Sequence, residues 1–186
     1  MFLLGLLTKT TDELVDRPMK GKMHKARLAT SVAYGLVAGY LASTGPEFAT
    51  LITAIVIGVL ATGKIDSGEH QLGIAAMIAV IALLGLPEII VLPFALLACL
   101  AVLDEALNDY ADRRKAATVG KAERQGKGIA PRLLGARLLA EAGAAAIGLA
   151  TGNWLYLIAM LSFDVAYSLV DKAVSRIPKI WAGAPK

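Results

Sequence analysis

Apolar residues along this chain are gathered into long blocks that are separated by short turns or charged clusters. Four blocks without any charged residue cover 28–46, 48–63, 71–87 and 89–103, and two further apolar blocks cover 133–151 and 153–170. A helix needs about 17–25 mostly apolar residues to cross a bilayer. The pattern therefore predicts an all-α polytopic membrane helix bundle with about six transmembrane helices, formed as a single transmembrane domain over 1–186. One of the shorter blocks could instead be re-entrant, and Met1–Leu7 is too short to cross.

The composition supports a membrane protein. Hydrophobic residues make up 56% of the chain, charged residues 18%, and the mean hydropathy is +0.62. Soluble domains are on average about 45–50% apolar and about 25% charged. These values exclude a disordered chain, a nucleic-acid-binding protein and an ordinary water-soluble enzyme. The single cysteine, Cys99, excludes an internal disulfide, and its apolar neighbours predict that it is packed as a small hydrophobic residue.

Of the 19 Lys and Arg residues, 18 lie in alternate connections between the predicted helices, and the other, Arg137, lies at the entry of the fifth block. They precede the first block, lie between the second and third and between the fourth and fifth, and follow the sixth. Basic residues collect on the cytoplasmic side of membrane proteins. We therefore expect an integral protein of the cell membrane, in contact with membrane lipids, with both termini in the cytoplasm. Residues 1–27 are then a cytoplasmic N-terminal segment and 113–132 a cytoplasmic loop.

Carboxylates gather on the same predicted side. Asp12 and Asp16 share one helix face, and Asp104, Asn108 and Asp112 form a stripe on another helix with Asp109 beside it. Like charges at this spacing repel, so a compensating charge is required. Neighbouring basic residues would supply it at ordinary solvated helix ends. Magnesium ions, which take oxygen ligands and are often bound together with a phosphate, would supply it at a metal site.

The residues around both clusters resemble the aspartate motifs of the UbiA superfamily of intramembrane prenyltransferases, in a shortened form. The first motif lies in Thr11–Lys22 and the second in Asp104–Lys115, with four predicted spans between them. The resemblance implies magnesium-dependent transfer of a prenyl group from a prenyl diphosphate to a lipid or aromatic acceptor. It further implies that metal and diphosphate are held by Asp12, Asp16, Asp104, Asn108, Asp109 and Asp112, with Arg17 and Lys20 assisting at the substrate. We expect the two clusters to line one cytoplasm-facing pocket.

One further carboxylate, Asp164, lies inside the last apolar block. A carboxylate in a membrane span is a candidate metal ligand, proton relay or substrate contact, unless a hydroxyl group on a neighbouring helix binds it. This leaves two other function classes open, a small cation-coupled transporter or channel and a noncatalytic lipid-binding membrane protein. His24 and His70 are interpreted as solvated, and the Gly35/Gly39 pair as a close helix contact.

Overall fold

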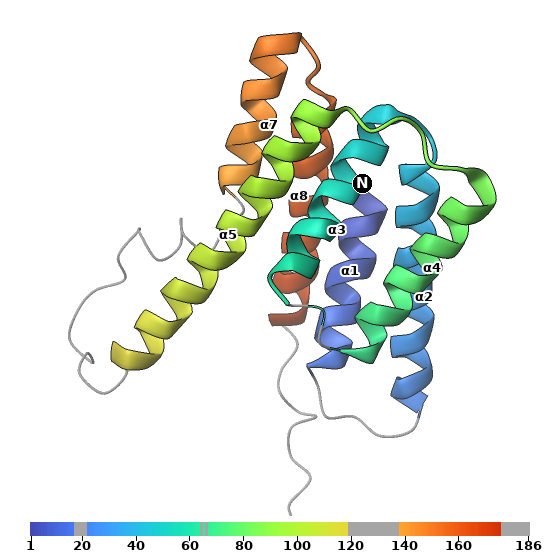
Figure 1. Cartoon of the computed structure of the whole chain (residues 1–186). Helices are drawn as coiled ribbons and strands as arrows, with labels where there is room; N and C mark the ends of the chain where they lie inside the picture. Colours follow the sequence, from blue (N-terminus) through green and yellow to red (C-terminus); the bar gives the residue numbers. More distant parts are fainter. Residues whose placement is uncertain (17–21, 64, 66, 119–137, 176–186) are drawn as a thin grey trace, which may run out of the picture. The chain divides into compact units, whose positions relative to one another are not determined.

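The computed structural model describes residues 1–16, 22–63, 65, 67–118 and 138–175. Within this part of the chain all regular structure is helical and no strand is present, so the predicted all-α class is confirmed. The helices, shown in Figure 1, are α1 (Phe2–Val15), α2 (Lys22–Ala42), α3 (Pro46–Ala61), α4 (Gly68–Leu84), α5 (Val91–Thr118), α7 (Leu138–Thr151) and α8 (Leu155–Ser175).

Local signals explain where several helices begin and end. Pro46 lies in the first turn of α3, where its missing N–H costs nothing. Ser67 is the N-cap of α4, and its hydroxyl oxygen accepts a hydrogen bond from the backbone N–H of His70 at 3.3 Å. Gly152, in the predicted turn between the last two helices, has a φ of +75°, which favours glycine. Within the described residues, most of each predicted apolar block lies on one helix.

The chain divides into two compact units. The first consists of Met1–Leu41, Ser67–Gly85 and Ile158–Lys186, and it contains α1, α2, α4 and most of α8. The second consists of Ala42–Asp66 and Leu86–Leu157, and it contains α3, α5 and α7. The predicted single transmembrane domain stays a prediction.

Glycines bring helices of the first unit close together. A Cβ atom on Gly35 of α2 would lie 2.1 Å from the backbone oxygen of Gly73 on α4. One turn further, a Cβ atom on Gly39 would lie 2.7 Å from the backbone oxygen of Met77. Gly5 of α1 makes a similar approach to the backbone of Phe163 on α8. The interpretation of Gly35 and Gly39 as a close helix contact is therefore confirmed.

In the second unit α5 packs against both α3 and α7. Leu97 and Ala101 of α5 are buried in this core, at 1% and 9% exposure. Cys99 lies two positions from each of them and hence on nearly the opposite side of the helix, because successive residues are rotated by about 100°. The Cys99 side chain is exposed, so the expectation that it is packed as a small hydrophobic residue is wrong.

One segment of the described helices, Val91–Tyr110 of α5, is long and apolar enough to cross a membrane by length and composition. Only 22% of the most apolar 18-residue stretch of this segment is buried within the protein. Helices α3, α4 and α7 are apolar but shorter.

Candidate functional site

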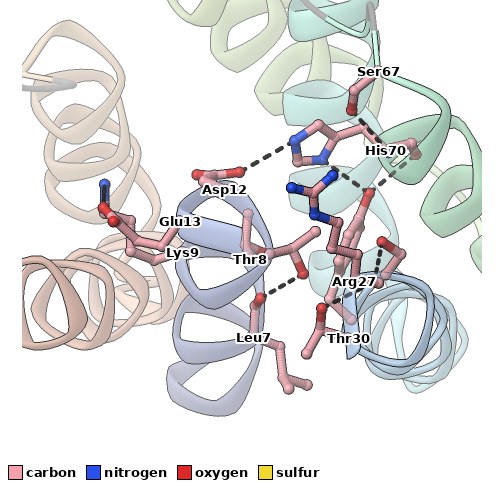
Figure 2. Close-up of polar contacts among 12 residues, drawn as sticks. Leu7, Thr8, Lys9, Asp12, Glu13, Arg27, Thr30, Ser67 and His70 are labelled. Atoms are coloured by element: carbon pink, nitrogen blue, oxygen red, sulfur yellow. Dashed lines mark hydrogen bonds and ion pairs between the residues drawn. The ribbon is translucent and has the colours of Figure 1, made fainter. Parts of the chain in front are cut away.

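The Asp12 side chain lies at a contact between three helices of the first unit. Its Oδ1 atom is 3.2 Å from Nε2 of His70 on α4, and its Oδ2 atom accepts a 2.7 Å hydrogen bond from the hydroxyl of Tyr167 on α8. Figure 2 shows Asp12 and His70 pointing toward one another from α1 and α4. Residues far apart in sequence thereby hold both carboxylate oxygens.

His70 is not the solvated side chain that the sequence suggested. Besides its contact with Asp12, its Nδ1 atom is 3.3 Å from the Tyr34 hydroxyl, which also donates to the His70 backbone oxygen at 3.0 Å. The sequence interpretation failed because the imidazole is at the first turn of α4, where α1 and α2 pack against it. His24, the other histidine, is exposed as expected.

Charged side chains surround this contact. Lys9 Nζ lies 3.0 Å from Glu13 Oε1 and 3.2 Å from Asp171 Oδ1, and it also lies 4.9 Å from the ring centre of Tyr167. On the α2 side, Arg27 NH1 lies 3.8 Å from Glu69 Oε1. Glu13, Asp171 and Glu69 each have a basic partner, and the Lys9 charge also acts on Asp12, which limits the repulsion that the sequence alone suggested.

These neighbours keep Asp12 ionised. Burial by itself would raise the pKa of the Asp12 carboxyl, but the hydrogen bonds from His70 and Tyr167, together with the charges of His70 and Lys9, outweigh it. The net effect is a pKa of Asp12 below its ordinary value. An ionised carboxylate has about four lone-pair sites, and the two hydrogen bonds use two of them. The other two could bind a metal ion.

The lowered pKa predicts how acid affects stability. A carboxyl whose folded-state pKa is below its unfolded value of about 3.9 stabilises the fold fully above that value, and this stabilisation is lost as the pH falls toward the folded-state pKa. We expect the unfolding free energies of the wild type and Asp12→Asn to differ most near pH 6 and to converge below about pH 4. Chemical denaturation over this pH range measures the difference. A difference in unfolding free energy that stays constant down to pH 2.5 contradicts the lowered pKa of Asp12.

In the second unit, Asp104 caps a helix. Its Oδ1 accepts a 3.1 Å hydrogen bond from the backbone N–H of Leu139, and its Oδ2 accepts a 2.9 Å bond from that of Ala140. These N–H groups belong to the first turn of α7, which has no intrahelical acceptor for them. Asp104 is only 5% exposed. This carboxylate therefore stabilises α7 and offsets the dipole at the helix N-terminus.

Capping predicts a difference between two substitutions. Asp104→Ala removes both acceptors and is expected to lower the unfolding free energy by about 1–2 kcal/mol, in the range for lost N-caps. Asp104→Asn keeps one acceptor oxygen and should cost less than half as much. Thermal unfolding of the two variants in the same detergent makes the comparison. An Asp104→Ala protein as stable as the wild type would contradict the capping role.

Asn108 lies one turn after Asp104 on α5. Its side-chain oxygen Oδ1 is buried and has no hydrogen-bond partner. An amide oxygen in this state loses its hydration without compensation, at a cost of about 1–3 kcal/mol. Such an oxygen is a suitable ligand for a hard cation. Asp109, the next residue, is half-buried.

The structure shows less about the other residues of the predicted site. Asp16 is exposed at the end of α1, and Asp164 is half-buried on α8. No residue that the structure describes forms a hydrogen bond or ion pair with Asp164. Arg17 and Lys20 lie outside the described residues, and Asp112 lies on α5 in a part where only the backbone is described.

The two aspartate clusters belong to different units, Asp12 and Asp16 to the first and Asp104, Asn108 and Asp109 to the second. The expectation of one shared pocket stays a prediction. Over the described ranges, no three His, Cys, Asp or Glu side chains are grouped so that they could hold a metal ion. Amide oxygens such as that of Asn108 are not among these side-chain types.

Comparison with protein-family models, curated proteins and solved structures finds no match for this chain. The resemblance to the UbiA superfamily therefore rests on the two aspartate motifs themselves.

Proposed function

We propose that this chain is an integral membrane protein whose six apolar helices span the bilayer. Large apolar side chains are unusually exposed on them, including Leu83 at 84%, Leu92 at 79% and Leu149 at 77%. Water disfavours such surfaces by about 25 cal/mol per Å², whereas lipid chains accept them. The gathering of basic residues in alternate connections, with Arg137 at the entry of the fifth block, supports the same arrangement, with both termini in the cytoplasm.

The topology is testable with single cysteines in a Cys99→Ala background. Gly68→Cys is expected to lie in the cytoplasm and Glu88→Cys outside. Both positions are exposed, and a Cβ atom at Gly68 would meet nothing within 4 Å. In intact cells a membrane-impermeant maleimide should label Glu88→Cys to near completion and leave Gly68→Cys at background. The reverse pattern, or equal labelling before cell lysis, contradicts the topology.

Within this membrane framework we further propose a magnesium-dependent prenyltransferase of the UbiA type. The observation that carries this proposal is the buried, unpartnered Oδ1 atom of Asn108 within the sequence Asn-Asp-Tyr-Ala-Asp, 108–112. Buried polar atoms without a partner are few in folded proteins, and a bound ion or water is one explanation for such an atom. The ionised Asp12, with two lone pairs unused, supports the same chemistry on the first motif.

The proposed roles combine the two aspartate motifs with the contacts of Asp12 and Asp104. Two sets of side chains are proposed to bind magnesium and, through it, the diphosphate. The second motif supplies Asn108, Asp109 and Asp112, and the first supplies Asp12 and Asp16. Arg17 and Lys20 are proposed to bind phosphate oxygens. Asp104 is assigned mainly to positioning, because it is only 5% exposed and its carboxylate caps the first turn of α7. When bound, magnesium would stabilise the negative charge of the departing pyrophosphate.

The proposal is tested by equilibrium binding of radiolabelled farnesyl diphosphate to the purified protein in detergent. We expect saturable binding in magnesium that falls at least about tenfold in EDTA, because the diphosphate is held through the metal. Farnesol, which has the same tail without the diphosphate, is the matched control and should bind alike in both buffers. Diphosphate binding that ignores magnesium would overturn the proposal.

A second candidate function is a cation-coupled transporter, which the state of Asp164 favours. This half-buried carboxylate on an apolar helix has no partner in the part of the chain that the structure describes. Such carboxylates mark cation or proton paths in membrane proteins. Liposomes containing the wild type would then show a cation flux that Asp164→Asn abolishes and that Asp12→Ala retains. A flux absent from the wild type eliminates this candidate.

A further inference from the structure

The orientation of Asp12 depends on side chains that α1 does not supply. His70 of α4 contacts one carboxylate oxygen at 3.2 Å, and Tyr167 of α8 donates to the other at 2.7 Å. Asp12 lies near the end of α1, four residues before its C-cap residue Asp16. Without these contacts the carboxylate would rotate about its side-chain torsions.

The contact with Asp12 also determines the hydrogen position on His70. An ionised carboxylate oxygen can only accept a hydrogen bond, so Nε2 must carry the proton that faces Oδ1. The other ring nitrogen, Nδ1, faces the Tyr34 hydroxyl at 3.3 Å. Carboxylates that bind metals are commonly oriented by hydrogen bonds from neighbouring side chains that do not themselves touch the metal.

His70 is itself held from two directions. Its backbone N–H donates to the Ser67 hydroxyl oxygen in the N-cap of α4, and Tyr34 approaches from α2. Tyr34 reaches this place because Gly73, one turn further along α4, has no side chain. A Cβ atom on Gly73 would lie 2.1 Å from both Cζ and Oη of Tyr34. The chain of contacts therefore runs from Gly73 through Tyr34 and His70 to Asp12.

We propose that His70 is a positioning residue for the first aspartate motif, which directs the unused lone pairs of Asp12 toward its ligand. What Asp12 binds, magnesium and a diphosphate, rests on the proposed function. The orientation of Asp12 by His70 does not, because it is a property of the metal-free protein.

Two substitutions separate the donor from the ring. His70→Gln retains an N–H group that can reach Asp12, whereas His70→Leu removes the donor and keeps an apolar side chain of similar bulk. The exposed His24 provides the matched control, His24→Leu. The first readout is the infrared carboxylate band of Asp12 in metal-free protein, isolated by subtracting the spectrum of the same variant carrying Asp12→Asn. The second is magnesium-dependent binding of farnesyl diphosphate.

We expect His70→Leu to shift and broaden the Asp12 band and to weaken magnesium-dependent binding about 10–100-fold, as is usual for residues that orient a metal ligand. His70→Gln and His24→Leu should remain within about threefold of the wild type. If His70→Leu does not fold, Tyr34→Phe is measured instead, with a smaller change in the same direction expected.

An Asp12 band and an affinity that His70→Leu leaves unchanged would overturn the positioning role. So would equal losses in His70→Leu and His70→Gln, because they would show that the ring shape matters and the donor does not. If the wild type binds no farnesyl diphosphate, the proposed function fails, and the infrared band still decides whether His70 orients Asp12.

Discussion

Asp12→Ala and Asp109→Ala are each expected to weaken magnesium-dependent binding of farnesyl diphosphate by about 100-fold or more. This exceeds the about 10–100-fold loss that is typical when a residue behind a metal ligand is changed, because here the proposed ligand itself is removed. The pKa of the Asp12 carboxyl is lowered, so its removal deletes a negative charge at the proposed metal site. Asp109 follows the unpartnered oxygen of Asn108 on α5.

Control variants separate this effect from general changes in charge. Glu88→Gln removes an exposed carboxylate between α4 and α5, and Asp164→Asn removes one inside α8. Both should stay within about threefold of the wild type. Isothermal titration in detergent, with each variant's thermal unfolding recorded, makes the comparison. Losses in Glu88→Gln as large as those in Asp12→Ala would show that the two motifs have no special role.

Gly35→Ala is expected to cause the largest loss of stability among single-methyl substitutions. The new Cβ atom would lie 2.1 Å from the oxygen and 2.9 Å from the carbonyl carbon of Gly73, and 2.9 Å from the Ala76 Cβ atom. Two of these atoms are backbone, so α2 and α4 must separate. Overpacking of this kind costs about 1–3 kcal/mol or more, although alanine is intrinsically the better helix former by about 1 kcal/mol.

Gly68→Ala is the matched control for this prediction. Gly68 is the first residue of α4, and a Cβ atom there would meet nothing within 4 Å. Its substitution should leave the unfolding free energy unchanged or slightly raised. Chemical unfolding of both variants in one detergent measures the difference. A Gly35→Ala protein as stable as Gly68→Ala would contradict the close contact between α2 and α4.

The helices could be predicted from the sequence because each depends on local signals. Uninterrupted apolar blocks, Pro46 in the first turn of α3 and Gly152 at a positive φ all act within a few residues. The Gly35/Gly39 spacing also indicated a close contact, although the partner helix could not be named. Local patterns therefore identified the elements and some of their packing faces.

The contacts of the candidate site could not be predicted in the same way. Asp12 and Tyr167 are 155 positions apart, and Asp104 meets Ala140 across 36 positions. No periodicity within a helix encodes such pairs, because they depend on how the helices pack. The sequence therefore predicts a solvated His70 and a metal-binding Asp104, whereas His70 contacts Asp12 and Tyr34 and Asp104 accepts hydrogen bonds from α7. One local signal does bear on His70. It lies three residues after the N-cap residue Ser67, which places it in the first turn of a helix and not in a loop.

The central claim, a magnesium-dependent prenyltransferase, is tested most directly by pyrophosphate release from farnesyl diphosphate in reconstituted vesicles. An aromatic acid and glycerol phosphate are offered in turn as acceptors. The account predicts release that requires magnesium and one of these acceptors, or a lipid of the vesicle, and that Asp109→Ala abolishes. No release by a folded wild-type protein, together with a cation flux that depends on Asp164, would contradict it.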